Sequence, residues 1–237
     1  MKKVFSVIIA VAVCLTSYAG QPLFSNLGAN VGVGTTGVSV ELSTPVTNFV
    51  QMRAGVSIMP GITFNSDADF SYSAAGVNQN GTASLKGDLG RVQGQVIFNI
   101  YPASTRLPLY IALGAYFGGS HLVEITGHSD DLEQYGGGNV IIGDYNIPVD
   151  ENGNVSGGIK VKSFRPYIGI GWGRAVPGKR VNFSVDLGVQ IHGKPELYSE
   201  AGEITRSLID DNNTFNKIMD KVKVYPTLTF RMGFRAF

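Results

Sequence analysis

The fold of this chain is decided by the stretch Arg180-Val-Asn-Phe-Ser-Val-Asp-Leu-Gly-Val-Gln-Ile-His192, along which apolar and polar residues alternate without a break. Successive side chains of a β-strand point to opposite faces, so one face of this strand is wholly apolar and the other wholly polar. The stretch exceeds the usual strand of about 5–6 residues and reaches the roughly 9–11 residues that a tilted strand needs to cross a bilayer. It therefore predicts a long strand between an apolar and a polar environment.

Length and composition narrow the fold class. The chain has 237 residues and no evident linker, which fits one large β domain. No internal run approaches 18 apolar residues, so the sequence excludes a transmembrane helix. Glycine accounts for 31 residues, about 13% against a usual ~7%. Without the three-residue period of collagen, this excess indicates a small barrel with a crowded interior.

The start of the chain is typical of a secretory signal peptide. Met1–Lys3 is basic, Val4–Cys14 is an apolar run, and the small residue Ala19 precedes the expected cleavage point. Cleavage would remove residues 1–19 and leave a barrel domain of residues 20–237. The sequence therefore predicts export through the secretory pathway.

Cysteine and charge exclude several kinds of chemistry. The only cysteine is Cys14, and a lipoprotein anchor there is the alternative to a cleaved signal, although Val13 is larger than the usual residue before such an anchor. The mature chain would have no thiol, and we expect no disulfide, no cofactor and no metal site. Loss of Lys2 and Lys3 leaves 17 basic residues against 18 acidic ones, which predicts no binding to nucleic acid.

The alternation seen in the first stretch recurs along the chain. Seven strands are clear, and they are expected at 38–42, 49–58, 85–100, 109–117, 164–174, 181–191 and 222–237. Before them the phase of the alternation changes at Gly34-Thr-Thr-Gly37, so residues 21–43 form either one bulged strand or a hairpin of two. We favour the hairpin because it makes the strand count even.

The connections alternate between short and long. Short turns fall near residues 46, 104 and 177, and long loops are expected at about 59–84, 126–158 and 194–221. In the last loop four apolar residues have helical spacing, namely Phe215, Ile218, Met219 and Val222. Membrane barrels place short turns on the periplasmic side and long loops outside. We therefore predict an all-β, eight-stranded antiparallel up-and-down transmembrane barrel with a short helix in its last loop.

Alternation alone does not say which face is inside, because a lipocalin-like barrel turns its apolar face inward and a membrane barrel turns it to lipid. Here the polar face is rich in glycine and still carries charge, which suits a narrow lumen where charges pair. Aromatic residues also cluster at the strand ends, as in interfacial girdles: Phe49, Tyr101, Phe117, Phe164 and Tyr225. We predict a structural network of lumen charges made of Glu41, Arg53, Arg91, Asp186, Arg231 and Arg235.

Several segments resemble small outer-membrane β-barrel proteins of the OmpA-like and OmpW-like type. They include Ala-Leu-Gly-Ala-Tyr-Phe-Gly-Gly, Tyr-Ile-Gly-Ile-Gly-Trp-Gly and the terminal Thr-Leu-Thr-Phe-Arg-Met-Gly-Phe-Arg-Ala-Phe237. The resemblance implies an outer-membrane location and recognition of the terminal aromatic by the barrel-assembly machinery. The apolar residues expected two, four and six places before Phe237 are replaced by Arg235, Gly233 and Arg231, so this assembly motif is imperfect.

Three functions follow as hypotheses. The leading one is a non-enzymatic barrel with a closed or very narrow lumen, which contacts outer-membrane lipid and lipopolysaccharide and acts in envelope integrity or surface contact. Eight strands leave room only for side chains, which argues against a general porin. The second is a narrow conduit for small apolar molecules, as the OmpW resemblance implies. The third is a lipid-modifying enzyme using His121 or His192 with nearby Ser120, Glu124 and Glu196, although no spacing among them is diagnostic.

Overall fold

The computed structural model describes residues 26–74, 77–102, 107–128, 133, 138–142, 145–178, 180–200, 202, 204–206 and 222–235. Eight strands form a closed antiparallel barrel in the order β1-β16-β13-β12-β7-β6-β3-β2. Their bounds are β1 Gly28–Gly34, β2 Gly37–Thr47, β3 Val50–Met59, β6 Arg91–Ile100, β7 Leu109–Phe117, β12 Phe164–Trp172, β13 Val181–Ile191 and β16 Val224–Arg235. The predicted eight-stranded barrel is therefore confirmed.

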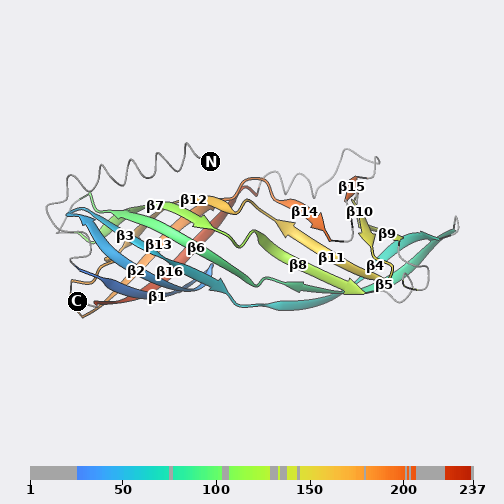
Figure 1. Ribbon diagram of the computed structural model, residues 1–237, viewed down its shortest axis with the longest axis horizontal. Helices are drawn as coiled ribbons and strands as arrows, with labels where there is room; N and C mark the ends of the chain where they lie inside the picture. Colours follow the sequence, from blue (N-terminus) through green and yellow to red (C-terminus); the bar gives the residue numbers. More distant parts are fainter. Residues whose placement is uncertain are drawn as a thin grey trace.

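A second antiparallel sheet extends from one end of the barrel, as Figure 1 shows. Its order is β14-β11-β8-β5-β4-β9-β10-β15. The bounds are β4 Thr63–Ala74, β5 Val77–Asp88, β8 His121–His128, β9 Gly138–Ile142, β10 Tyr145–Val149, β11 Asn154–Lys160, β14 Glu196–Ser199 and β15 Thr205–Arg206. We call this part of the molecule the second sheet, the barrel end beside it the sheet end, and the opposite end the turn end.

The second sheet corrects the prediction of irregular loops. The three long connections exist where they were expected, but much of their described length is strand. The hairpin of β4 and β5 pairs twelve residues on each side, from Thr63 with Asp88 to Ala74 with Val77. The hairpin alternates as the barrel strands do, with Phe64, Phe70 and Tyr72 between polar residues, but its many Asp, Asn and Ser residues indicated a loop. The predicted helix at Phe215–Val222 and the signal peptide lie largely or wholly outside the described residues.

Short breaks separate the barrel strands from their continuations in the second sheet. Gly118 and Gly119 lie between β7 and β8 with φ of 75° and 52°, a conformation that favours glycine. Between β5 and β6 the carboxylate of Asp88 accepts a hydrogen bond from the Gly90 N–H at 2.5 Å. The strand predicted over 85–100 is therefore two strands, because the chain turns at Leu89 and Gly90.

The opening of the barrel is a hairpin, as favoured from the phase change. β1 and β2 pair from Gly28 with Ser43 to Gly34 with Gly37, which leaves a two-residue turn. Gly37 has a φ of 92°, and a Cβ there would lie 2.1 Å from the carbonyl oxygen of Ile58. Only glycine fits this position, so the residue that interrupts the alternation is the one that the turn requires.

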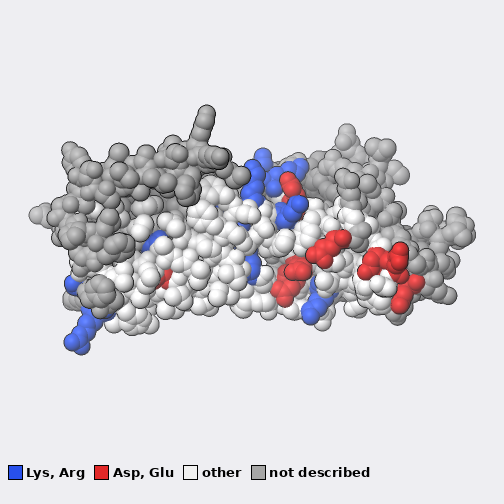
Figure 2. Space-filling model, viewed as in Figure 1, with Lys and Arg blue, Asp and Glu red and all other residues white. Residues whose placement is uncertain are grey.

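The apolar face of the barrel points outward. Phe183, Leu187 and Ile191 are 67%, 56% and 46% exposed, whereas Asp186 between them is 2% exposed. The visible barrel wall is mostly uncharged, and charged side chains gather near the second sheet in Figure 2. Such a wall suits hydrocarbon and not water, so the membrane interpretation is confirmed over the lipocalin-like one. No helix among the described residues is long and apolar enough to span a membrane.

A charge placed on the wall at mid-strand should destabilise the barrel in a bilayer. Leu187 lies near the middle of β13 and faces outward, so Leu187→Arg is expected to cost about 2–4 kcal/mol of unfolding free energy. The same change at Val181, where β13 begins, should cost about 0–1 kcal/mol. Urea titration of both variants in lipid vesicles, followed by heat-modifiable gel migration, measures the difference. Equal costs at the two positions would contradict the outward-facing wall.

Candidate functional site

Four charged side chains meet in the middle of the lumen. Glu41 of β2, Arg53 of β3, Asp186 of β13 and Arg231 of β16 are 1%, 1%, 2% and 5% exposed. Arg53 Nη1 lies 3.3 Å from Glu41 Oε2, and Arg53 Nη2 lies 2.6 Å from Asp186 Oδ2. Arg231 Nε lies 3.0 Å from Glu41 Oε1, and Arg231 Nη2 pairs with Asp186 Oδ1. Each acid thus pairs with both arginines; we call these four residues the charge ring.

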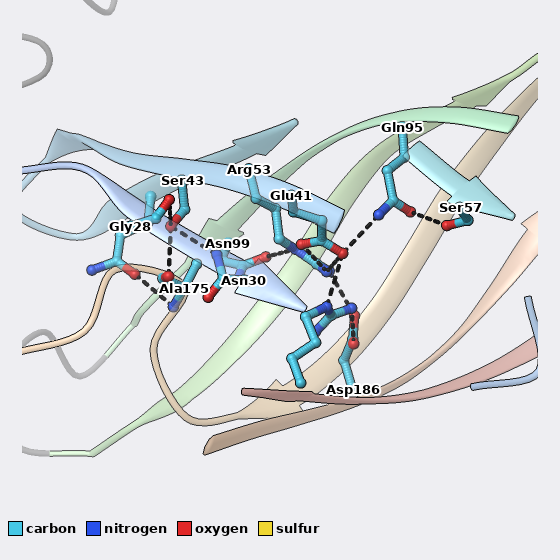
Figure 3. Close-up of polar contacts among 12 residues, drawn as sticks. Gly28, Asn30, Glu41, Ser43, Arg53, Ser57, Gln95, Asn99, Ala175 and Asp186 are labelled. Atoms are coloured by element: carbon cyan, nitrogen blue, oxygen red, sulfur yellow. Dashed lines mark hydrogen bonds and ion pairs between the residues drawn. The ribbon is translucent and has the colours of Figure 1, made fainter. Parts of the chain in front are cut away.

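Neutral side chains use the remaining hydrogen-bonding capacity of the charge ring. Gln95 Nε2 donates to Glu41 Oε1 at 2.6 Å, the Tyr167 hydroxyl donates to Asp186 Oδ2 at 2.9 Å, and Arg53 Nε donates to Asn99 Oδ1 at 3.2 Å. Figure 3 shows groups of this network reaching the lumen centre from different strands. Buried charges are tolerated when they are both paired and hydrogen-bonded, and the ring meets both conditions.

Glycines provide the space for these large side chains. Gly32 of β1 is in register with Arg231, and a Cβ at Gly32 would lie 3.0 Å from the Cγ of Arg231. A Cβ at Gly171 would lie 2.3 Å from the ring of Tyr110. The tyrosines pack on one another, with ring centroids 5.4 Å apart for Tyr101 and Tyr110. The glycine excess in the sequence therefore reflects a lumen filled with arginine and tyrosine.

At the turn end the connection between β12 and β13 folds into the barrel mouth. Ala175 and Val176 are 4% and 7% exposed, and both of their N–H groups donate to Gln51 Oε1 at 3.0 Å. The Ala175 carbonyl accepts a hydrogen bond from Ser43 Oγ at 2.6 Å, and the Tyr101 hydroxyl donates to Gln51 at 3.1 Å. This connection, which we call the plug, lies in the barrel mouth below the charge ring.

At the sheet end Arg165 occupies the lumen, and the hydrogen bonds of its guanidinium go to neutral acceptors. They reach Gln190 Oε1 at 3.2 Å and Gln93 Oε1 at 2.8 Å. The guanidinium also donates to the carbonyls of Gly118, Gly119 and Lys162, at 2.7, 3.1 and 3.2 Å. Arg165 was missed in the sequence, although the alternation of β12 places it on the polar face with Tyr167.

The structure brings together four of the six residues predicted for the lumen network and places the other two elsewhere. Arg91 lies at the sheet end, where its guanidinium carbon is 4.9 Å from the centre of the Tyr225 ring. Arg235 is exposed at the turn end and donates to Asn26 Oδ1 at 2.5 Å. Alternation assigns a residue to a face but not to a height in the barrel. Six residues along β6 separate Arg91 from Ile97, the register partner of Arg53, a rise of roughly 20 Å.

The residues considered for catalysis lie in different surroundings. The ring of His121 stacks on that of Tyr198, with centroids 4.8 Å apart. His192 is 1% exposed at the sheet end of the lumen. In the described part of the chain, no cluster of His, Cys, Asp and Glu could hold a metal ion. The two histidines therefore occupy separate places, one stacked in the second sheet and one enclosed by the barrel.

The turn between β10 and β11 is held by a carboxylate. Asp150 accepts hydrogen bonds from the N–H groups of Asn152 and Asn154 at 3.0 and 2.7 Å. These bonds, led by the one from Asn154, lower the pKa of Asp150. The acidic cluster at 150–154 is therefore a local turn of the second sheet, as its composition of Asp, Asn and Gly indicates.

Comparison with known proteins gives a loose similarity to three solved structures. No protein-family model and no curated protein sequence matches the chain. Structures of CarO and CarO2 from Acinetobacter baumannii are each 21% identical, with TM-scores of 0.49 and 0.47; the alignments cover 90% and 91% of this chain and 99% and 100% of theirs. A major outer membrane protein from Thermus thermophilus is 16% identical with a TM-score of 0.38, over 89% of this chain and 98% of that one. The fold assignment therefore rests on the strand order and the apolar wall.

Removal of one acid from the charge ring should strongly destabilise the barrel. Asp186→Ala leaves Arg53 and Arg231 with one carboxylate between them, and breaking such a buried pair costs about 3–5 kcal/mol. Glu151→Ala, at an exposed turn, should stay within about 0.5 kcal/mol. Urea unfolding in vesicles measures both. The double variant Asp186→Leu with Arg231→Leu should recover part of the loss, since it removes a charge of each sign. A single variant as mild as the control would contradict the ring.

Loss of the acceptor at Gln51 should release the plug. Gln51→Leu removes the acceptor of the Val176 N–H, at about 1–3 kcal/mol, and leaves the Ala175 N–H with only the Tyr101 hydroxyl at 3.2 Å. Amide hydrogen exchange of these two residues, followed by NMR in detergent micelles, should accelerate by about tenfold or more. Gln95→Leu, which alters a lumen glutamine bonded to Glu41, is the control and should leave this exchange unchanged. Unaltered exchange in the Gln51 variant would show that the plug is held by other contacts.

Proposed function

We propose that the chain is an integral outer-membrane protein with a closed lumen, whose work is done by the second sheet at the cell surface. The charge ring carries this proposal. Four ionised side chains from four strands pair across the lumen centre, and buried tyrosines and the plug fill the space on either side. A solute would have to break paired charges in a barrel only wide enough for side chains.

The orientation proposed places the turn end in the periplasm and the second sheet outside. Short turns on the periplasmic side and long connections outside are the rule for such barrels. The second sheet then extends from the outer leaflet and presents the charged side chains visible over it in Figure 2. Its strands β14 and β15 are the two ends of the sheet order and so form its edges. A strand-paired surface with charged side chains supports a role in envelope integrity or in contact with a surface partner.

The same proposal covers lipid contacts and biogenesis. The exposed apolar wall contacts outer-membrane lipid and lipopolysaccharide, and the barrel-assembly machinery inserts the chain after secretory export. The role is non-enzymatic, because His192 is enclosed in the lumen and His121 packs against Tyr198 at the base of the second sheet. A conduit for small apolar molecules would instead require a gap beside the charge ring.

Conductance separates the closed barrel from the conduit. The purified protein in planar bilayers should give no discrete current steps, and liposomes that contain it should take up small ionic and small apolar solutes no faster than empty liposomes. The variant Gln51→Leu serves as the comparison that loosens the plug and keeps the charge ring. Protease added to intact cells should cut within the second sheet and leave the turn end intact. Current steps, or uptake of an apolar solute by the unaltered protein, would contradict the closed lumen.

A further inference from the structure

At the sheet end of the lumen two arginines have no counter-charge among the residues that the structure describes. Arg91 and Arg165 both point into it, and their charges act on each other and on His192. The ion pairs in the described part of the chain join neither arginine to a carboxylate. This contrasts with the charge ring below, where two acids balance two arginines. Among the described residues, the sheet end of the lumen therefore has two arginines without a carboxylate partner.

The same region contains buried donor groups without acceptors. Gln93 and Gln190 are 1% and 2% exposed, and the Nε2 group of each makes no hydrogen bond. In both side chains the Oε1 atom accepts a hydrogen bond from Arg165. The Nε2 group of each amide can therefore donate to a different acceptor. The Nε of Arg91 and the Nδ1 of His192 also lack partners. Unmade hydrogen bonds of buried groups are costly, so such a concentration of them calls for an acceptor.

The strand register places these groups around one point. Arg91 and Gln93 are two residues apart on the inward face of β6, and Gln190 lies two residues before His192 on β13. Gln190 is in register with Tyr225 of β16, and Arg91 lies over the ring of Tyr225. In the circular strand order β6 and β16 lie on opposite sides of the barrel, so Arg91 reaches across the lumen. Arg91 itself is partly exposed, which leaves the site accessible from the sheet end.

We propose that the outer lumen binds a small oxyanion, a carboxylate or a phosphate group, between Arg91 and the amide nitrogens of Gln93 and Gln190. The anion would supply the missing negative charge to Arg91 and Arg165 and accept from the unmade donors. Arginine suits this role because its planar donors match the oxygens of carboxylate and phosphate. The guanidinium of Arg91 lies against the Tyr225 ring and its Nε makes no hydrogen bond, so it can move to admit the anion.

Titration of the folded protein in detergent micelles with sodium acetate and sodium phosphate, at constant ionic strength, tests the site. The ¹H–¹⁵N signals of the Arg91 Nε and of the Gln93 and Gln190 amides should shift saturably. Arg91→Gln should weaken binding by about tenfold or more. Arg235→Gln makes the same charge change at the turn end and should leave the affinity unchanged. No saturable shift, or equal affinity in Arg91→Gln, would overturn the proposal.

A second variant keeps the test decisive if Arg91→Gln folds poorly. Gln190→Glu places a carboxylate beside Arg165, so it should abolish anion binding and raise the urea midpoint. A third arm adds vesicles that contain bisphosphorylated lipid A. Binding of lipid A without binding of either free anion would overturn the lumen site in favour of a lipid contact on the outer surface. This site does not require a closed lumen, so a conductance result that contradicts the proposed function would leave it standing.

Discussion

The structure depends on one constraint: charges buried at the centre of a small barrel in hydrocarbon must pair with opposite charges from other strands. Glu41 lies on β2 and Asp186 on β13, with β1 and β16 between these two strands. Each of the two acids pairs with both Arg53 and Arg231. The pairing also specifies register. A slip of β13 by one residue would turn Asp186 toward lipid and Leu187 into the ring, and both changes are strongly unfavourable.

The charge ring explains why the remaining lumen looks as it does. Arginine and tyrosine side chains long enough to meet at the centre need small residues opposite them, and Gly32 and Gly171 are two of these. The polar side chains Gln95, Asn99 and Tyr167 complete the hydrogen bonds of the ring. Above and below the ring the lumen differs: the plug at the turn end is held by neutral groups, and at the sheet end Arg165 has only neutral partners among the described residues. The proposed closure and the proposed anion site thus lie on either side of the charge ring.

Much of this could be predicted from sequence, because alternation separates the two faces of each strand and the charges on the glycine-rich polar face indicate that it lines the lumen. The opening stretch predicted β13, and its face assignment was right for Phe183, Asp186 and Leu187. The hairpin at Gly34–Gly37 followed from the change of phase. The second sheet was not predicted: β4 does alternate, with Phe64, Phe70 and Tyr72 between polar residues, but its many Asp, Asn and Ser residues indicated a loop. Arg91 and Arg235, predicted for the same network, lie apart from the charge ring, because a period of two gives no position along the barrel axis. No local sequence pattern predicted the plug, because its hydrogen-bond partner Gln51 lies 124 residues from Ala175 in the chain.

The central claim, that apolar side chains face hydrocarbon while ionic ones meet inside, is tested most directly by spin labels along β13. The only cysteine of the sequence is Cys14, so single cysteines can be placed in the mature chain at Phe183, Ser184, Leu187 and Gln190. In lipid vesicles, the collision rate with oxygen, which concentrates in the bilayer interior, should be high at Phe183 and Leu187 and low at Ser184 and Gln190. High rates at Ser184 and Gln190, with protection at Phe183 and Leu187, would contradict the account.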